Sequence, residues 1–251
     1  MFQQGVTLHQ QGQLDMAKMI YQTVLEIDRN FYPALHMMGV IAAQQQDFSR
    51  AVDLISRAID VYPADPSMHF NLANALKDTG RVHEALASYD KAIALKPDYA
   101  EAYSNRGNTL KAMGNLSESI ASYDKAVKLR PNYADAYYNR GNALQDINEL
   151  HAAVKSYEMA IKFRPNYAEA YSNRGNALRK LDLLDAAAES YKKALSFAPT
   201  HENALAGLAR VLLKKGKHLE GLGMQRAAFG SICFDMKNGL TIIQKTQHAT
   251  I

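Results

Sequence analysis

The chain has 251 residues, of which 47% are hydrophobic and 22% are charged, and its net charge is +4. No apolar run approaches the ~18 residues that a membrane span needs, and the opening MFQQGVTLHQ has neither the basic start nor the apolar core of a secretory signal. Cys233 is the only cysteine, which excludes an internal disulfide. We therefore expect a cytoplasmic protein without membrane contacts.

The chain repeats itself at an interval of 34 residues, which the positions of five prolines mark: Pro63, Pro97, Pro131, Pro165 and Pro199. Self-similarity at a fixed period of this size indicates a stacked repeat architecture. Aligned on the prolines, the units span 32–65, 66–99, 100–133, 134–167 and 168–201. A partial unit at 1–31 precedes them, a degenerate capping unit at 202–235 follows them, and 236–251 form a C-terminal tail. The predicted repeat array therefore covers 1–235.

Each unit reads as two amphipathic helices. In 100–133, Tyr103, Gly107 and Leu110 have helical spacing, and so do Leu116, Ile120 and Tyr123 after them. Small residues recur at fixed places in both helices, such as Gly107 in the first, which lets the two helices approach closely. The tyrosines at helical spacing are expected to pack in the core. The fold class is predicted to be all-α, a right-handed superhelical solenoid of stacked helical hairpins.

The turn inside each hairpin is expected to contain a residue at positive φ, because a helix commonly ends in that conformation. The predicted positions are Gly12, Gly80, Gly114, Asn148, Asp182 and Gly216, with Gln46 as the one residue that does not suit it. The second helix should stop before the proline. The polar residue after the proline is expected to cap the next helix, as Asp98, Asn132 and Asn166 would.

The small residues, aromatics and closing proline of the 34-residue hairpin resemble those of the tetratricopeptide repeat family, and NLANALKDTGRVHEALASYDKAIALKPDYAEAY at 71–103 carries the pattern most fully. The chain departs from the family pattern in having no tryptophan. It also has Arg106, Arg140 and Arg174 where a leucine is usual. We interpret these arginines as structural, with stems packed along neighbouring helices and heads that reach carboxylates or carbonyls.

Asparagines repeat in two rows. The first row consists of Asn71, Asn105, Asn139 and Asn173, and the second row, three residues further along the same helix face, consists of Asn74, Asn108, Asn142 and Asn176. Asparagine is a mediocre helix former, so eight in helix interiors need an explanation. In tetratricopeptide arrays these positions line the concave groove. A carboxamide matches both the C=O and the N–H of a peptide bond, so the rows could hold an extended chain.

The resemblance thus implies a scaffold or adaptor that binds an extended protein segment, as in the repeat region of O-linked N-acetylglucosamine transferases, which has a similar asparagine ladder. Beside the rows, Phe70, Ser104, Tyr138 and Ser172, and then Lys77, Lys111, Gln145 and Arg179, would supply specificity. The candidate binding residues are both rows together with Lys77, Lys111, Tyr138 and Arg179. An alternative is that each asparagine bonds the neighbouring repeat and fixes the stacking.

No catalytic, metal-binding or phosphate-binding motif occurs in the sequence. We therefore predict that the chain is not an enzyme, has no cofactor and binds no metal. The basic KKGKH at 214–218 lacks the interleaved aromatic residues of a nucleic-acid interface, so no nucleic-acid partner is expected. The predicted partner is a protein or peptide.

Two alternatives remain open. The opening residues are similar to the repeat segments that precede transferase domains in bacterial proteins, so the chain could be the substrate-recognition region of a larger glycosyltransferase-type enzyme. The end units could also mediate self-association, because their stacking faces lack a neighbour.

Overall fold

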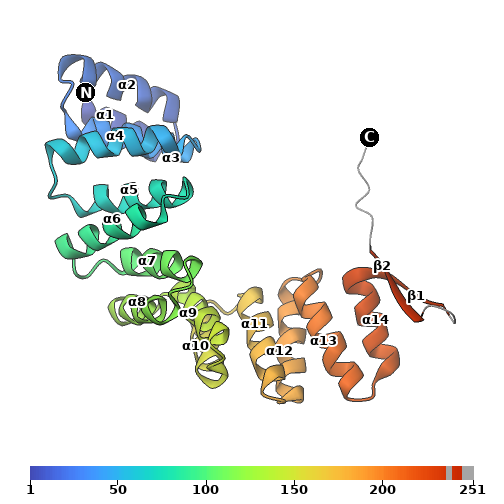
Figure 1. Cartoon of the computed structure of the whole chain (residues 1–251). Helices are drawn as coiled ribbons and strands as arrows, with labels where there is room; N and C mark the ends of the chain where they lie inside the picture. The colour runs from blue at the N-terminus through green and yellow to red at the C-terminus, as the bar shows by residue number, and fades with distance from the viewer. Residues whose placement is uncertain (236–238, 245–251) are drawn as a thin grey trace, which may run out of the picture. The chain divides into compact units, whose positions relative to one another are not determined.

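The computed structural model describes the backbone of residues 1–235 and 239–244 and the side chains of residues 1–228. The elements follow one another as antiparallel helix pairs in chain order (Figure 1). Their bounds are α1 Phe2–Gln10, α2 Leu14–Ile27, α3 Tyr32–Gln44, α4 Phe48–Val61, α5 Pro66–Asp78, α6 Val82–Leu95, α7 Ala100–Ala112, α8 Leu116–Leu129, α9 Ala134–Asp146, α10 Leu150–Phe163, α11 Ala168–Lys180, α12 Leu184–Phe197, α13 Glu202–Lys214 and α14 His218–Phe229.

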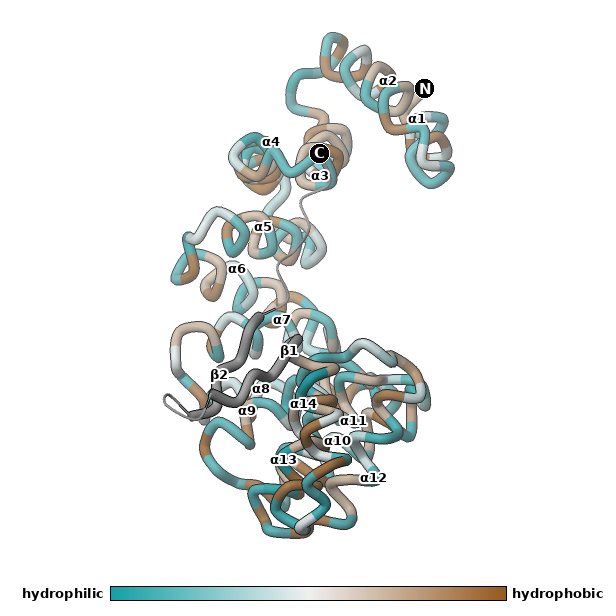
Figure 2. The backbone as a smooth tube through the Cα atoms, turned by 90° about the vertical axis from the view of Figure 1, so that its right-hand side faces the viewer, coloured by the Kyte–Doolittle hydropathy of each residue, from teal (hydrophilic) through white to brown (hydrophobic). Residues whose placement is uncertain are grey.

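The helix contacts divide the chain into two compact units, residues 1–130 and 131–251. Unit 1 holds the hairpins α1/α2, α3/α4, α5/α6 and α7/α8, and unit 2 holds α9/α10, α11/α12 and α13/α14. In each unit the helices of a hairpin pack on each other and on the next hairpin. Hydrophobic and hydrophilic residues alternate along the helices (Figure 2), and every helix has residues that are buried. The predicted all-α fold class of stacked helical hairpins is confirmed for residues 2–229.

The chain after α14 is not helical. Strand β1, Gly230–Asp235, pairs antiparallel with β2, Gly239–Gln244, with Ser231 opposite Ile243. The sequence analysis predicted no strand here and assigned 230–235 to the capping repeat, although isoleucine and threonine favour strands. Residues 236–238 and 245–251 of the predicted tail lie outside the described residues.

The helix ends follow the predicted places but not the predicted chemistry. Helix α8 ends at Leu129, before Pro131, as expected. Asp98 does not cap α7 with its side chain: the N-cap is Tyr99, and the backbone carbonyl of Asp98 instead accepts from the amide of Ala100 at 3.0 Å. Asn132 and Asn166 behave in the same way. The prediction of side-chain caps at these three residues was therefore wrong.

The turn inside every hairpin has a residue at positive φ, as predicted for the glycines and for Asn148 and Asp182. Gln46 adopts the same conformation at φ 63°. The fixed turn geometry thus overrides the preference of glutamine, at a local cost of about 1–2 kcal/mol.

The small residues on the first helices make room for the large ones on the second. A Cβ built on Gly107 would stand 2.7 Å from Cε1 of Tyr123, and Gly141 and Gly175 face Tyr157 and Tyr191 at similar distances. Hairpin α5/α6 has Ala73 at this place. The absence of a side chain therefore sets how closely α7 approaches α8, and the tyrosine fills the space that results.

Five tyrosines on second helices, one in each of five hairpins, are fully buried: Tyr21, Tyr89, Tyr123, Tyr157 and Tyr191. A charged phenolate is disfavoured in such a place because it would lose its hydration. Burial accordingly raises the pKa of Tyr123 to about 12, and the pKa of Tyr89 and Tyr157 also rises well above the ordinary value.

The close approach of α7 and α8 predicts the effect of a methyl group. Gly107→Ala should lower the free energy of unfolding by about 1–3 kcal/mol, towards the lower value because Ala73 is accommodated in its own hairpin. Gly223→Ala is the control: nothing lies within 4 Å of its added Cβ, and its helix should gain stability. Urea unfolding followed by circular dichroism measures both, and equal effects would contradict the packing account.

The buried tyrosines predict a loss of stability in alkali. The folded chain keeps the proton of Tyr123 to about pH 12, whereas the unfolded chain releases it near pH 10, so this stability is complete below pH 10 and falls as the pH rises to 12. The loss for this one residue is about 3 kcal/mol. Unfolding at a series of pH values should show a shallower decline for Tyr123→Phe than for the natural chain. Parallel curves for the two proteins would contradict the assignment.

Candidate functional site

The second asparagine row is bonded to the buried tyrosines. In four hairpins the tyrosine hydroxyl donates to the carboxamide Oδ1 of the asparagine 15 residues earlier: Tyr89 to Asn74 at 2.6 Å, Tyr123 to Asn108 at 2.7 Å, Tyr157 to Asn142 at 2.9 Å and Tyr191 to Asn176 at 2.8 Å. A buried hydroxyl needs such a partner. This bond explains why asparagine recurs inside these helices.

The first row links neighbouring hairpins. Nδ2 of Asn105 donates to Oδ1 of Asn74 at 2.9 Å in unit 1, and Nδ2 of Asn173 donates to Oδ1 of Asn142 at the same distance in unit 2. The oxygens of Asn74 and Asn142 therefore accept two bonds each, one from their own hairpin and one from the next. Two acceptances fill the lone pairs of a carboxamide oxygen. The prediction that asparagines bond the neighbouring repeat is confirmed at these two places.

The network changes where the repeated residues change. Asn71 has no asparagine on the preceding hairpin and donates to Nε2 of His36 at 2.9 Å. Burial lowers the pKa of His36, which favours the neutral ring that can accept this bond. In α1/α2, Val6 stands where four of the other hairpins have the second-row asparagine, and the hydroxyl of Tyr21 is buried without a partner among the described residues.

Part of the hydrogen-bonding capacity of the rows remains unused. Within the described residues, Nδ2 of Asn74 and Asn142 and Oδ1 of Asn105 have no hydrogen-bond partner, and the side chain of Asn139 makes no hydrogen bond at all. All eight asparagines are half-buried rather than enclosed. Because the bonded atom fixes the orientation of each amide, the remaining donors and acceptors are held in place.

A pocket of about 260 Å³ lies beside both rows in unit 1. Asn71, Asn74 and Asp78 of α5 give it a polar side. Its apolar residues come from three helices: Val40 and Ala43 of α3, Phe48 and Ile55 of α4 and Ala75 of α5. Val40 occupies the place of a second-row asparagine, so the pocket opens where the pattern is interrupted. The sequence patterns did not predict this pocket, although valine at position 40 in place of asparagine was a visible signal.

The other predicted binding residues have varied surroundings. Lys77 is paired with Asp78 at 3.2 Å, and Lys111 is half-buried with a partner of its own. Tyr138 packs its ring on Tyr167 at 4.9 Å between centroids and accepts a hydrogen bond from Asn173 at 3.1 Å. Its hydroxyl is therefore part of the network in unit 2.

Arg179 differs from these residues because its Nε is buried without a hydrogen-bond partner in the described part of the chain, as is Oε1 of Gln145. Ser104 and Ser172 are buried, 2% and 0% exposed, and offer no surface to a ligand. The expectation that these two serines supply specificity was wrong, because their side chains are buried.

Arginines around the rows have structural contacts, as predicted, and acids of neighbouring helices are their partners. Arg106 donates to Asp90 of the preceding hairpin at 2.7 Å and to the hydroxyl of Ser122 at the same distance. Asp135, near the start of α9, accepts two bonds from Arg164 at 2.7 and 2.8 Å. These charges are committed to holding helices together.

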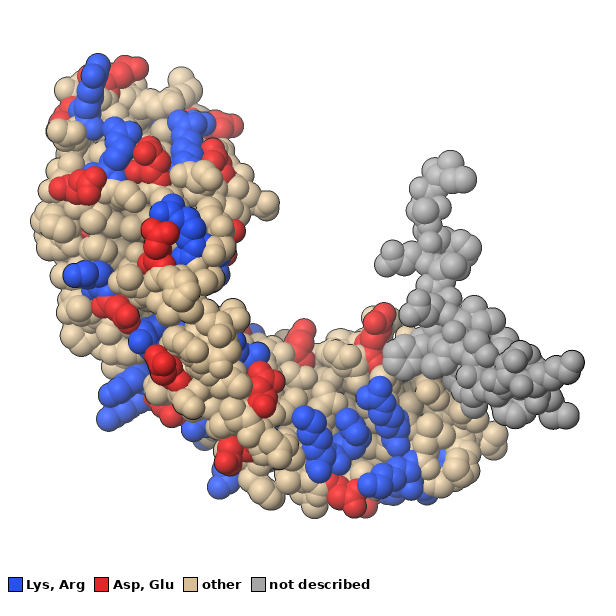
Figure 3. Space-filling model, viewed as in Figure 1, with Lys and Arg blue, Asp and Glu red and all other residues tan. Residues whose placement is uncertain are grey.

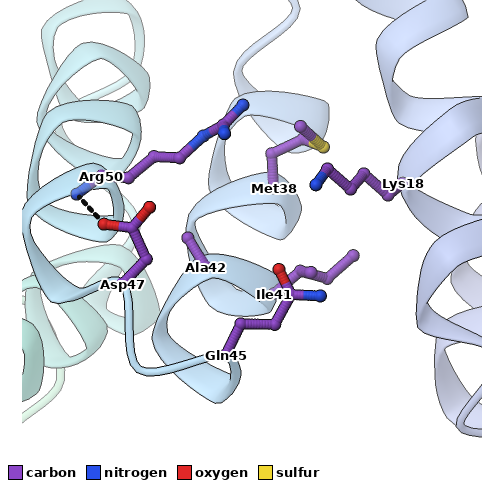
Figure 4. A pocket seen from close by; sticks show the side chains of 7 residues that line it. All are labelled: Lys18, Met38, Ile41, Ala42, Gln45, Asp47 and Arg50. Atoms are coloured by element: carbon purple, nitrogen blue, oxygen red, sulfur yellow. Dashed lines mark hydrogen bonds between the residues drawn. The ribbon is translucent and has the colours of Figure 1, made fainter.

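A second hollow, of about 20 Å³, lies among α2, α3 and α4 (Figure 4). Lys18 reaches towards Met38 there, and Asp47 accepts from the backbone N–H of Arg50 at 3.1 Å, which caps α4. A space of this size holds about one water molecule, so we exclude it as a ligand site. Within the described residues no cluster of histidine, cysteine, aspartate and glutamate has the make-up of a metal site, and no helix is long and apolar enough to cross a bilayer.

Family models match most of the array. The model described as "TPR repeat" matches residues 73–114, 107–148 and 146–182, and models described as "Tetratricopeptide repeat" match 168–201 and 1–31. A curated relative, the peroxisomal targeting signal receptor of Kluyveromyces lactis, is 32% identical over 62 residues, which are 25% of this chain and 11% of the relative. The TPR repeat-containing protein YpiA of Bacillus subtilis is 27% identical over 81 residues, 32% of this chain and 19% of the relative. The chain thus spans less than a fifth of either relative.

Solved structures agree. YrrB, described as a TPR protein with an unusual peptide-binding site, has a TM-score of 0.61 and 25% identity over 69% of this chain and 90% of its own. MamA has a TM-score of 0.60 and 27% identity over 62% of this chain and 92% of its own. The C-terminal part of a TPR repeat-containing protein from Cytophaga hutchinsonii, at 16% identity, shares the fold with a TM-score of 0.75 over 91% of this chain and 94% of its own. Together with the repeated hairpins and their tyrosine–asparagine bonds, these matches place the chain in the tetratricopeptide repeat family.

Proposed function

We propose that this chain is a protein-interaction scaffold that binds extended peptide segments along the asparagine rows of its first helices. The observation that carries the proposal is the coincidence of the 260 Å³ pocket with Asn71 and Asn74, which brings half-buried amides and an apolar recess to one place. A recess with a few positioned polar groups is the usual composition of a ligand site.

The free atoms of the rows suit a peptide backbone. Nδ2 of Asn74 and Asn142 can donate to peptide carbonyls, and Oδ1 of Asn105 can accept from a peptide N–H. Because Tyr89 and Asn105 hold Oδ1 of Asn74, its amide needs no reorientation on binding. A preorganised group loses less entropy when the ligand arrives, which favours affinity.

The pocket in unit 1 would add side-chain selectivity. Its volume exceeds the 150 Å³ of an engineered cavity that binds benzene, so an aromatic or large aliphatic side chain of the peptide can enter between Phe48 and Ala75. YrrB, a relative at 25% identity, is described as having a peptide-binding site. This description supports a peptide ligand for this chain.

Replacing the asparagine nitrogen while keeping its oxygen tests the proposal. Asn74→Asp with Asn142→Asp preserves the acceptors of Tyr89 and Tyr157 but converts the free donors into acceptors, which repel a peptide carbonyl. Peptides selected from a random phage-displayed library on the natural chain should bind the double variant at least about tenfold more weakly, measured by fluorescence anisotropy. Thermal unfolding should stay within a few degrees of that of the natural chain.

The matched control is the double variant Asn132→Asp with Asn166→Asp, because it makes the same chemical change in exposed loops outside the rows. Its affinity should equal that of the natural chain. The proposal is wrong if the row variant retains full affinity, if the loop variant loses as much, or if the library yields no binding peptide.

A further inference from the structure

Another recess, of about 440 Å³, lies in unit 2 and shares no residue with the asparagine rows. Tyr171 and Arg174 of α11 and Glu189, Lys192, Lys193 and Ser196 of α12 line it. Three cations and one acid therefore surround this recess. Figure 3 shows lysine and arginine side chains gathered over the part of unit 2 that holds α11, α12 and α13.

Lys192 reverses the charge of the residue at this position in the three preceding units. The same position holds Asp90, Asp124 and Glu158 in the three preceding units. Asp90 shows the purpose of the acid, because it binds Arg106 of the next hairpin. In the last hairpin Leu208 replaces that arginine, so Lys192 has no role in joining α12 to α13. The positive charge at this place is thus not required by the stacking.

Arg174 also lacks the ion pair that Arg106, at the equivalent position, makes with an acid of the preceding hairpin. Arg106 uses its guanidinium on both Asp90 and Ser122, whereas Arg174 donates only from Nε, to Ser190 at 3.1 Å, and makes no ion pair with Glu158 in the described residues. The side chain is half-buried, and its guanidinium lies 5.5 Å from the ring centroid of Tyr171. A partly desolvated guanidinium with free N–H groups is well suited to a carboxylate or phosphate.

The remaining groups complete a cationic site with an aromatic side. Lys193 lies over the ring of Phe197 at 5.1 Å, and Phe197 packs against Tyr171 at 5.9 Å between centroids. Neither Lys192 nor Lys193 has an acidic partner in the part of the chain that the structure describes. Glu189 is the one acid of the recess, so a net charge of +2 remains for a ligand.

We propose that this recess binds the anionic side chains of an acidic protein segment, either carboxylates or phosphate esters, with Arg174, Lys192 and Lys193 as the ligand-binding residues. The shared chemistry is a compact oxyanion that accepts from a guanidinium and two ammonium groups. The site is independent of the asparagine rows, so one partner could be held at two places or two partners at once.

The test uses three fluorescein-labelled probes on the whole chain: a peptide of alternating glutamate and serine, a peptide of glutamine and phosphorylated serine whose only negative side chains are the phosphates, and an oligothymidylate. Lys192→Asp restores the residue type that Asp90 and Asp124 hold, so the fold should be kept. Binding of the peptide probes should weaken by about tenfold at low salt. The ratio of the two peptide affinities separates carboxylate from phosphate as the preferred source, and inorganic phosphate should compete with the phosphorylated peptide.

Lys125→Asp makes the same change in net charge at an exposed lysine of unit 1 and should weaken binding less than about twofold. The proposal is overturned if neither peptide binds the natural chain, or if the Lys192→Asp variant binds the peptides as tightly as the natural chain. It is also overturned if Lys125→Asp loses as much affinity as Lys192→Asp, because equal losses would indicate general charge attraction. Tighter binding of the oligothymidylate than of either peptide, lost in Lys192→Asp, would assign the recess to nucleic acid instead.

Discussion

The carboxamide oxygen shared by a tyrosine and an asparagine is the interaction on which the arrangement of the hairpins depends. Oδ1 of Asn74 accepts from Tyr89 of its own hairpin and from Asn105 of the next, and Asn142 does the same in unit 2. Apolar packing alone permits neighbouring hairpins to slide, because it is non-directional. A bifurcated acceptor at a half-buried site has a defined geometry, so it fixes the register of one hairpin on another.

The same bonds give the first helices a functional surface. An amide whose oxygen is held twice can present only its nitrogen, so Asn74 in unit 1 and Asn142 in unit 2 each display one oriented donor. Stability and recognition therefore draw on different atoms of one side chain. Where the repeat pattern is interrupted, space or charge becomes available: Val40 opens the pocket of unit 1, and Lys192 adds a positive charge to the recess of unit 2 where the three preceding units have an acid.

Most of the fold could be predicted because the same residue types recur at the same positions of each repeat. The 34-residue period gave the hairpins, Gly107 opposite Tyr123 gave the close packing, and Asn148 and Asp182 marked the turns. The caps could not be predicted from residue type, since Asp98 contributes its backbone carbonyl rather than its carboxylate. The strands β1 and β2 lie outside the repeat and gave no periodic signal. The bonds between tyrosine and asparagine required knowing which helix faces meet, although their constant spacing of 15 residues was present in four units.

The most direct measurement is a double-mutant cycle on the two donors that share Oδ1 of Asn74. Tyr89→Phe and Asn105→Ala each leave the oxygen one donor, whereas the double variant leaves it none, and a half-buried acceptor without a partner is costly. The free energy of unfolding that the double variant loses should exceed the sum of the two single losses by about 0.5–3 kcal/mol. Additive effects within about 0.3 kcal/mol would contradict the claim that this oxygen couples neighbouring hairpins.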